Sequence, residues 1–522
     1  MIGREIMSWK KEVQELEKLR AKALAMGGKE ALEKHHAKGR LGVRERIDIL
    51  LDKNSFQEHG SIAGGAERDD EGKLLDFTPA NYVTGLGTIE NRPVAVGGED
   101  FTVKGGSPNA AGLRKSIYAE ELALQYKRPL IRLLEGGGGS VAGAKSSGPV
   151  GNPVYERPRF QPISKILSVA PVASAALGPV AGFPAARFAA SHFSVMTKET
   201  AQILIAGPAV VSRALDKNLT KEDLGSAKIH SKNGVATNIA KDEVDALEQI
   251  KTFLSFLPTN VWQLPPVVTC TDDVGRCADE LLDIVPKNRR QPFNMRKLIK
   301  HVVDNGFLFE MNKSYGPSLI TAFARMNGQA VGVIGNDCKY YAGAMGANAA
   351  IKVRRFIELC DIFHLPIINF VDEPGFMIGP DSEQAGTIRF GTSAVATAVS
   401  SVVPWASIIV KKAFGVAAAA HFSDNSYTIA WPSAEMGALP VEGGVAVAFR
   451  RQIEQSDDPE RTRTELEAEL AAKQSPLPRG ESFSVHDVID PRETRPHLCN
   501  WIEWIRPGLE ELKGPVTFGY RP

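Results

Sequence analysis

Short turns rich in glycine and alanine are the parts of this sequence whose residue types and positions could do chemistry. Two lie in the first half of the chain: residues 136–140 in LLEGGGGS, and Gly182-Phe183 in GPVAGFPAARF. The second half holds two more, around Gly375 in DEPGFM and Gly415 in KKAFGVAAAAHF. Small residues at a helix start let backbone N–H groups and the positive end of the helix dipole approach a developing oxyanion. The turns therefore indicate chemistry on backbone amides.

Motifs for other chemistry fit poorly. A phosphate-binding loop needs glycine, four residues and then Gly-Lys-Ser/Thr, whereas Gly139, Gly143 and Lys145 have the wrong spacing. No GxSxG or HExxH motif stands out, and the five scattered cysteines form no CxxC pair, so no metal site or disulfide framework is expected. Four glycines in a row also suit a flexible linker. These follow a predicted strand directly and have a counterpart at Gly375, which favours a turn that lines a site.

The elements that position these turns occur twice. RPVAVGGEDF in the first half and QAVGVIGNDC in the second, 237 residues later, both enter a turn with glycine and aspartate. Gly138 and Gly375 are separated by the same 237 residues, and Gly182 and Gly415 are separated by 233 residues. The order is kept and the separation drifts by few residues, which favours a duplicated domain. The alternative is that any two α/β domains share such strands.

Each half predicts an α/β fold. PLIRLLE, PIINFVD and ASIIVKK have the continuous apolar character of strands buried on both faces, and helical segments such as NAAIKVRRFIELCDIF lie between strands. Pro258, Pro265 and Pro266 break helix and strand near the middle of the chain. We therefore expect an N-terminal domain over residues 1–265 and a C-terminal domain over residues 266–522.

Bulk composition excludes several classes of protein. The chain has 522 residues, 43% hydrophobic and 24% charged, with a net charge of +1, so no overall field would attract nucleic acid or a membrane surface. The longest apolar stretches are broken by proline, and no run of 18 apolar residues predicts a membrane span. With its unpaired cysteines, the composition predicts a cytoplasmic globular protein.

Several longer motifs resemble one family. KGRLGVRERIDILLD, EDFTVKGGS, ILIAGPAVV and GSAKIHSKNGVA lie in the first half; IVPKNRRQPFNMRKLI, FVDEPGFMIGPDSEQAGTIRFG and AWPSAEMGALPVEGG lie in the second. Over nearly its full length the chain is similar to the carboxyltransferase (β) subunits of biotin-dependent acyl-CoA carboxylases, such as the propionyl-CoA and methylcrotonyl-CoA enzymes. The resemblance implies two tandem crotonase-like domains of ββα superhelix, in agreement with the repeat.

The resemblance also implies a reaction and its sites. Carboxybiotin on a carrier gives its carboxyl group to the α (or vinylogous) carbon of an acyl-CoA, and two backbone oxyanion holes hold the thioester enolate and the ureido oxygen. The implied catalytic residues are Gly182 and Phe183 in the first hole and Gly415, Val416 and Ala417 in the second. Implied substrate-binding residues are Gly136, Gly137, Gly138, Gly139, Ser140, Gly375, Phe376 and Ala419.

The family also implies partners. The sequence has no Ala-Met-Lys-Met biotinyl site and no ATP-grasp half, so carboxybiotin is expected from a biotin carboxylase and carrier (α) subunit. Family members are hexamers, trimers of dimers, in which the first domain of one subunit faces the second domain of another. No partner of nucleic acid or membrane is implied.

The sequence departs from the family at four positions in these turns. Phe183 and Val416 stand where relatives have glycine, Ser140 where they commonly have arginine, and Ala419 where propionyl- and acetyl-CoA enzymes often have aspartate. If position 183 needs a positive φ, phenylalanine is strained there, and Pro184 offers no N–H. The acyl preference is therefore not transferable.

Two alternatives stay open at this point. A decarboxylase or transcarboxylase subunit would run the same half-reaction in reverse, and a divergent assembly subunit would have lost it. His192 and His421, which follow the two turns after buried strands, are expected in the core or just behind the site.

Overall fold

The computed structural model describes residues 8–137, 159–289 and 291–521. Gly138, Gly139 and Ser140, expected at the substrate site, lie outside the described residues. The chain divides between Leu254 and Ser255 into two compact units, called here the first and second units. The domain boundary expected after residue 265 stays a prediction.

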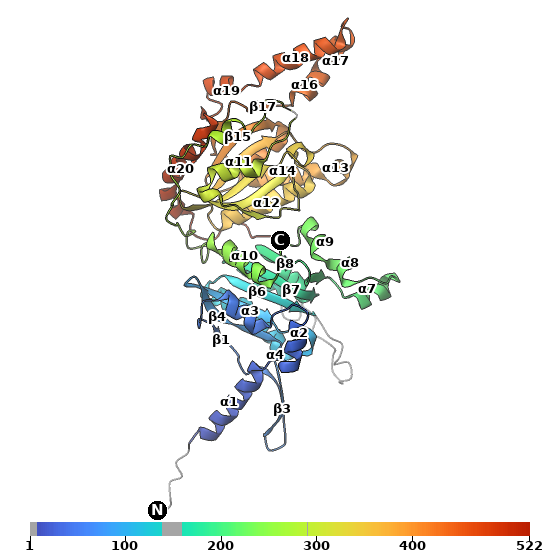
Figure 1. The fold of residues 1–522 in the computed structure, drawn as a ribbon, viewed down its shortest axis with the longest axis vertical. Coiled ribbons are helices and arrows are strands. Elements are labelled where there is room, and N and C mark those ends of the chain that lie inside the picture. The colour runs from blue at the N-terminus through green and yellow to red at the C-terminus, as the bar shows by residue number, and fades with distance from the viewer. Residues whose placement is uncertain (1–7, 138–158, 290, 522) are drawn as a thin grey trace, which may run out of the picture. The chain divides into compact units, whose positions relative to one another are not determined.

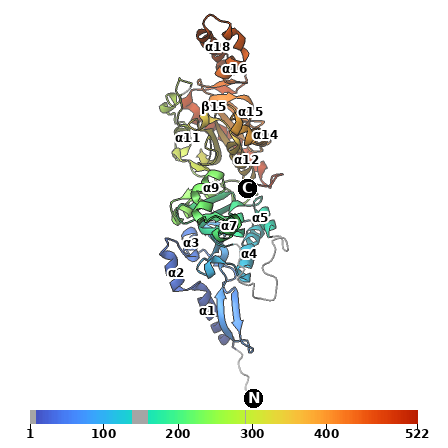
Figure 2. The ribbon, with the colours of Figure 1, turned by 90° about the vertical axis from the view of Figure 1, so that its right-hand side faces the viewer.

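The first unit is built on one eight-stranded sheet (Figure 1). Its strands are β1 (Gln57–Glu58), β4 (Tyr82–Ile89), β5 (Arg92–Glu99), β6 (Leu130–Gly136), β7 (Val172–Ala181), β8 (Phe193–Thr197), β9 (Gln202–Leu204) and β10 (Asn238–Ala240), with a separate hairpin of β2 (Gly64–Arg68) and β3 (Leu74–Pro79). Its helices are α1 (Lys10–Leu24), α2 (Lys29–His36), α3 (Val43–Leu50), η1 (Lys104–Gly106), α4 (Ala110–Tyr126), α5 (Phe160–Ile166), α6 (Phe183–Ala189), α7 (Pro208–Leu215), α8 (Lys221–Gly225), α9 (Ala227–Asn233) and α10 (Glu243–Ser255). Helix α1 runs alongside the hairpin (Figures 1 and 2), where Leu19, Ala23 and Phe77 form a small core.

The second unit repeats this plan. Its sheet contains β11 (Phe309–Met311), β12 (Leu319–Met326), β13 (Gln329–Asn336), β14 (Ile367–Glu373), β15 (Trp405–Phe414), β16 (Tyr427–Ala430), β17 (Glu435–Gly437) and β18 (Asp487–Val488). Its helices are η2 (Asp279–Leu282), α11 (Met295–Val302), η3 (Asp304–Gly306), η4 (Tyr341–Gly343), α12 (Ala347–Ile362), α13 (Pro380–Gln384), α14 (Thr387–Val399), α15 (Gly415–Ala418), η5 (Ala419–His421), α16 (Val441–Ala448), α17 (Arg450–Glu454), α18 (Pro459–Lys473), α19 (Leu477–Glu481), η6 (Pro491–Glu493), α20 (Thr494–Ile505) and η7 (Arg506–Leu512). Trp405 and Trp431 are fully buried there.

The two sheets have the same topology, which confirms the duplicated α/β fold. In each, the first three strands of the sheet path are antiparallel and the rest are parallel, with the order β1-β4-β5-β6-β7-β8-β10 matching β11-β12-β13-β14-β15-β16-β18. Strands β9 and β17 each pair with the long central strand, β7 or β15, near its end. All residues of β6 and β14 are buried, as expected for parallel strands covered on both faces.

A matching irregularity marks the end of both central strand pairs. Leu134 pairs with Ala176 and Gly136 with Val180, so β7 carries two extra residues there, and β15 carries the same excess against β14. The strand-end amide is held alike in both units. The Glu135 N–H donates to the Glu99 carboxylate at 2.9 Å, and the Asp372 N–H donates to the Asn336 side chain at 3.0 Å.

The repeat also includes the helix before each sheet, which the sequence comparison missed. Arg44 in α3 pairs with Glu58 at 2.9 Å, and Arg296 in α11 pairs with Glu310 at 2.8 Å, both at a separation of 252 residues. The signal was present in GVRERIDIL and NMRKLIKHV, in which three apolar positions coincide: Val43 with Met295, Ile47 with Ile299 and Leu50 with Val302. Among the described residues, no helix is long and apolar enough to cross a bilayer, and no group of His, Cys, Asp and Glu side chains is placed to hold a metal ion.

Candidate active site

The first turn joins β7 to α6 through Gly182. Gly182 has φ 67° and ψ −125°, a conformation that side chains with a Cβ avoid, so glycine is required here. Its own N–H donates to the Leu204 carbonyl of β9 at 3.1 Å. In this structure the Gly182 N–H is therefore already bonded within the sheet. Phe183 starts the helix and its N–H has no intrahelical acceptor, which leaves it as the donor at the turn.

Phe183 is not strained, because the condition named for strain, a positive φ at position 183, is not met. The positive φ falls on Gly182, while Phe183 is the first residue of α6 and does not have a positive φ. Pro184 takes the next position, where its missing N–H costs nothing. The Phe183 ring packs edge-on against Phe160 at 5.4 Å, and the Arg187 guanidinium lies over it at 4.3 Å. The side chain therefore closes one side of the turn.

A cluster of buried charged side chains holds helix α6 in place. Arg132 on β6 donates to the carbonyls of Arg187 and Ala190 at 3.0 and 2.9 Å, and so binds the C-terminal end of the helix. Glu120 on α4 accepts from Arg132 at 3.1 Å and from Arg187 at 3.3 Å. The three charged side chains are almost fully buried and mutually paired, so the helix that carries the Phe183 N–H is rigidly placed.

Strand β6 brings Gly136 beside the first turn. Gly136 pairs with Val180, two residues before Gly182. A Cβ on Gly136 would lie 2.9 Å from the Gly106 carbonyl oxygen and 3.2 Å from the Glu99 carboxylate, so only glycine fits. Gly137 has open space around it. The structure thus places Gly136 and Gly137 at the edge of the sheet that carries the first turn.

The acidic residue before the glycine run, Glu135, is the centre of a network that the sequence analysis missed. Its fully buried carboxylate contacts Arg46 at 2.7 Å, Arg40 at 3.1 Å and His35 at 3.3 Å. Arg46 also holds Glu243 through two bonds of 2.7 Å. Although burial opposes ionisation, the hydrogen bonds and charges of His35 and Arg46 lower the pKa of Glu135. The segment before β1 is thereby fixed to the site.

The pKa of Glu99, at the end of the neighbouring strand β5, is shifted in the opposite direction. Burial raises its pKa from 4.5 to about 7, and the nearby Arg187 offsets this only in part. The folded chain therefore holds a proton on Glu99 at pH values where the unfolded chain has released it. As pH rises from about 4.5 to about 7, this group lowers the free energy of unfolding.

A Glu99→Gln variant tests that linkage. The amide keeps an oxygen to accept the Glu135 N–H but cannot ionise, so the fall in stability between pH 5 and pH 7 should be shallower than in wild type, by up to about 1.4 kcal/mol per pH unit. Urea denaturation followed by far-UV circular dichroism at pH 5, 6 and 7 measures it. Parallel pH profiles for the two proteins would contradict the assignment.

The second turn joins β15 to α15 through Gly415, at φ 63°. Val416 follows with its side chain 63% exposed, and Ala417 is fully buried. Both are in the first turn of α15, where N–H groups lack intrahelical acceptors. As in the first turn, the positive φ belongs to the glycine, so valine is tolerated. Ala419 lies on η5, next to α14, so the acyl-pocket position expected there lies just beyond this turn.

Buried polar side chains also support the second turn. His421 on η5 contacts the Glu373 carboxylate and the Asn369 side chain, each at 3.1 Å, and the His421 and Glu373 side chains are both fully buried. The other Glu373 oxygen accepts the Gly375 N–H at 3.0 Å. His421 is thus a buried residue behind the second turn, and Glu373 ties the Gly375 turn to η5.

Phe376 and His192, the remaining residues singled out in the sequence, are both engaged in packing or hydrogen bonds within the fold. Phe376 pairs with Met345 and its ring fills the space over Gly391, where a Cβ would lie 2.3 Å away. His192 is buried, accepts the Val172 N–H at 3.0 Å and contacts the Leu167 carbonyl at 3.0 Å, as a core histidine does. The structure thus gathers Gly136, Gly137, Gly182 and Phe183 at one sheet edge, and Gly375, Phe376, Gly415, Val416, Ala417 and Ala419 at the matching edge of the second unit.

Comparison with known proteins agrees with this geometry. Residues 34–510 match the carboxyl transferase domain. The methylmalonyl-CoA decarboxylase subunit alpha of Veillonella parvula is 34% identical over 96% of this chain and 97% of its own length, and the mitochondrial propionyl-CoA carboxylase beta chain of Homo sapiens is 33% identical over 93% and 89%. The crystal structure of transcarboxylase 12S, with methylmalonyl-coenzyme A and methylmalonic acid bound, is 30% identical, covers 100% of this chain and 98% of its own, and superposes with a TM-score of 0.86.

The matches extend over both units, and the superposition confirms the crotonase-like carboxyltransferase fold. Paired turns of backbone donors, few side-chain bases and full-length similarity point to the same chemistry. The chain belongs to the carboxyl transferase family and is a carboxyltransferase of the biotin-dependent type that acts on acyl-CoA.

Proposed function

We propose that this chain moves a carboxyl group from carboxybiotin on a separate carrier subunit to the α (or vinylogous) carbon of an acyl-CoA. The observation that carries the proposal is the matched pair of turns, each with a positive-φ glycine between a central parallel strand and a helix. Each turn offers backbone N–H groups where negative charge would develop.

The first unit is assigned the acyl-CoA. Loss of the α-proton places negative charge on the thioester oxygen, and the Phe183 N–H with the start of α6 would stabilise it. Loss of one such donor costs roughly 3 kcal/mol of transition-state stabilisation. Gly136 and Gly137, with the run that follows them, would let the ligand approach the backbone closely.

The second unit is assigned the biotin end of the reaction. Gly415 and Val416 are exposed, and a Cβ on Gly415 would meet only the Ala438 carbonyl oxygen at 3.5 Å, so the turn can accept a bulky ring. The Val416 and Ala417 N–H groups would hold the ureido oxygen. When bound, biotin supplies the carboxyl group; the residues of this chain orient it and stabilise charge.

Exposed apolar side chains beside both turns support an oligomer. Ile205, next to the Leu204 carbonyl that binds Gly182, is 98% exposed; in the second unit Ile378 is 91% exposed and Val416 63%. Where such side chains gather in one patch, they mark a surface that a partner can cover. The related transcarboxylase core is described as a hexamer, and we propose a hexamer here, with a biotin-bearing subunit as partner. The five unpaired cysteines of this chain suit a cytoplasmic location.

A second candidate is the reverse reaction, because a methylmalonyl-CoA decarboxylase subunit is as similar to this chain as the carboxylases are. The test pairs the chain with its biotinylated partner and measures two activities. ATP-dependent fixation of labelled bicarbonate into one of a series of acyl-CoAs supports the carboxylase and names the substrate. Release of labelled CO2 from the carboxylated acyl-CoA, without fixation, supports the decarboxylase. Neither activity in a stable, biotinylated complex would indicate an assembly subunit.

A further inference from the structure

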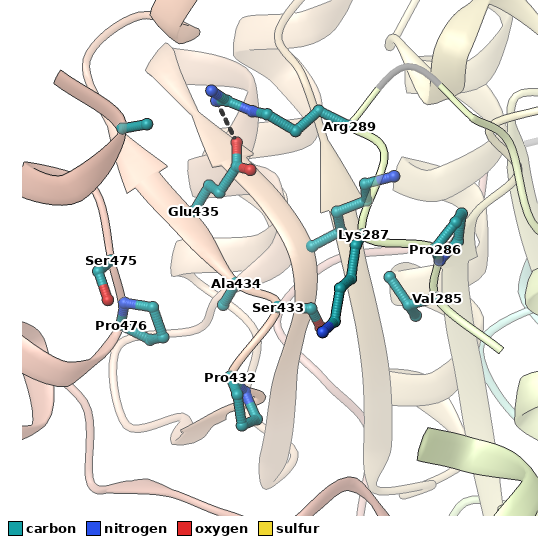
Figure 3. A pocket seen from close by; sticks show the side chains of 12 residues that line it. Val285, Pro286, Lys287, Arg289, Pro432, Ser433, Ala434, Glu435, Ser475 and Pro476 are labelled. Carbon is teal, nitrogen blue, oxygen red and sulfur yellow. Dashed lines mark hydrogen bonds and ion pairs between the residues drawn. The ribbon is translucent and has the colours of Figure 1, made fainter. Parts of the chain in front are cut away.

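The second unit contains a cavity of about 300 Å³ that the proposed reaction does not use. Its walls come from the segment before α11, from Lys411 on β15 with residues 432–435 at the start of β17, and from the end of α18 with its connection to α19. Figure 3 shows Arg289 reaching Glu435 from one side and Lys287 extending toward Ser433 from the other. All the described residues that line the cavity belong to the second unit.

The described side chains that line the cavity carry a net positive charge. Lys287, Arg289 and Lys411 are basic, and Glu435 is the one acidic side chain among the described residues that line it. Glu435 is already bound by Arg289 at 2.6 Å, and Arg289 keeps a buried Nε without a hydrogen-bond partner in the described structure. Lys411 is only 4% exposed and donates to the Gln291 carbonyl at 3.3 Å. Two positive charges are left in a partly enclosed space.

The corresponding corner of the first unit is filled. There Glu135 occupies the strand position of Asp372, and Gly178 occupies that of Lys411; a Cβ on Gly178 would lie 2.3 Å from the Glu135 carboxylate. Arg40 and Arg46 fold in from the segment before the sheet and pair with Glu135. In the second unit the equivalent segment contributes Lys287 and Arg289 but leaves a cavity. The fold itself does not require the opening.

Asp372, behind Lys411, does not remove the excess. Burial raises the pKa of its carboxyl to about 7, although Lys412 and Lys411 oppose the shift, so it is only partly ionised near neutral pH. One carboxyl oxygen of Asp372 is buried without a hydrogen-bond partner among the described residues. A bound anion would hold the Lys411 ammonium in place of that weak partner.

We propose that this cavity binds a small organic phosphate, with its dianionic group between Lys287, Arg289 and Lys411. A dianion matches the two excess positive charges, whereas a monocarboxylate would neutralise one. Pro286, Pro432 and Pro476 give the cavity an apolar wall for the organic part. Because β15 and β17 both end beside the second turn, the ligand lies on the elements that position Gly415.

The test measures binding to the full chain by isothermal titration calorimetry at constant ionic strength, with inorganic phosphate and phenyl phosphate as probes. Wild type should bind both, phenyl phosphate more tightly because of the proline wall. Lys287→Gln should weaken phosphate binding about tenfold, the loss of one charge-assisted contact. Lys297→Gln, an exposed lysine on nearby α11, is the matched control and should bind as wild type does.

Each outcome decides the proposal. Wild-type affinity in Lys287→Gln, or no heat above that of sodium chloride, would overturn the site. Phenyl phosphate binding no better than phosphate would overturn the organic ligand. Lys411→Met gives a second variant at the inner wall, and a folded Lys411→Met protein that binds phosphate normally would also sink the idea. Since binding is read without turnover, failure here leaves the carboxyltransferase proposal untouched.

Discussion

A Gly182→Ala variant is expected to lose about 100-fold in kcat for carboxyl transfer while the chain remains folded. The φ and ψ of Gly182, 67° and −125°, cost a residue with a Cβ on the order of 1–3 kcal/mol. Alanine relieves this strain by rotating the peptide between residues 182 and 183. That peptide carries the Phe183 N–H, the donor left at the first turn. The rotation therefore removes the donor without removing a side chain.

The assay is carboxylation of acyl-CoA with the biotinylated partner, read as kcat and KM separately. Gly207→Ala is the control, since Gly207 also precedes a helix but has φ −67° and no heavy atom within 4 Å of an added Cβ. It should keep wild-type kinetics. A Gly182→Ala enzyme with full kcat and a normal circular dichroism spectrum would show that the Phe183 N–H does not hold the oxyanion.

An Arg46→Met variant is expected to lower the free energy of unfolding of the first unit by about 3–5 kcal/mol. Methionine replaces the volume of arginine but leaves the carboxylates of Glu135 and Glu243 buried without their shared cation. Removing one partner of a buried ion network costs far more than the network contributes net, because the remaining charges stay desolvated. Urea denaturation monitored by far-UV circular dichroism measures the loss.

Two further variants isolate the cause. Arg461→Met removes an ion pair on α18 in which both side chains are mostly exposed, and no measurable change is expected. Adding Glu135→Gln and Glu243→Gln to Arg46→Met removes the two buried carboxylates that have lost their shared cation and should recover part of the stability. If the triple variant is no more stable than Arg46→Met alone, lost packing rather than buried charge explains the effect.

The sequence predicted the fold well because the duplicated strands are continuous apolar runs that end in glycine. Gly182 and Gly415 were found for a physical reason: a positive φ at a strand-to-helix turn restricts the residue type. The condition for strain at Phe183 is not met, and sequence alone does not show which residue of the turn carries that φ. The hydrogen bond from Gly182 to Leu204 was also missed, since it joins segments whose pairing appears only in the folded sheet.

The supporting networks were less predictable still. Arg46 and Glu243 are far apart in the sequence, and each looks like an ordinary charged residue on an amphipathic helix. Their burial depends on α3 and α10 meeting at the end of β6. The same is true of Glu373 and His421 in the second unit, which are far apart in the sequence and meet only in the folded chain. The sequence KGRLGVRERI did contain a signal, because Arg46 interrupts an otherwise apolar helix face, but this pattern does not identify the partner of the arginine.

The division of the chain after Leu254 has a spectroscopic consequence. Five of the six tryptophans, Trp262, Trp405, Trp431, Trp501 and Trp504, belong to the second unit, and Trp9 of the first is 76% exposed. Tryptophan fluorescence therefore changes almost solely when the second unit unfolds, whereas circular dichroism reports the unfolding of both units. A denaturation curve recorded with both probes assigns each transition to its unit without labels. Any variant described above can be placed on one unit by that comparison.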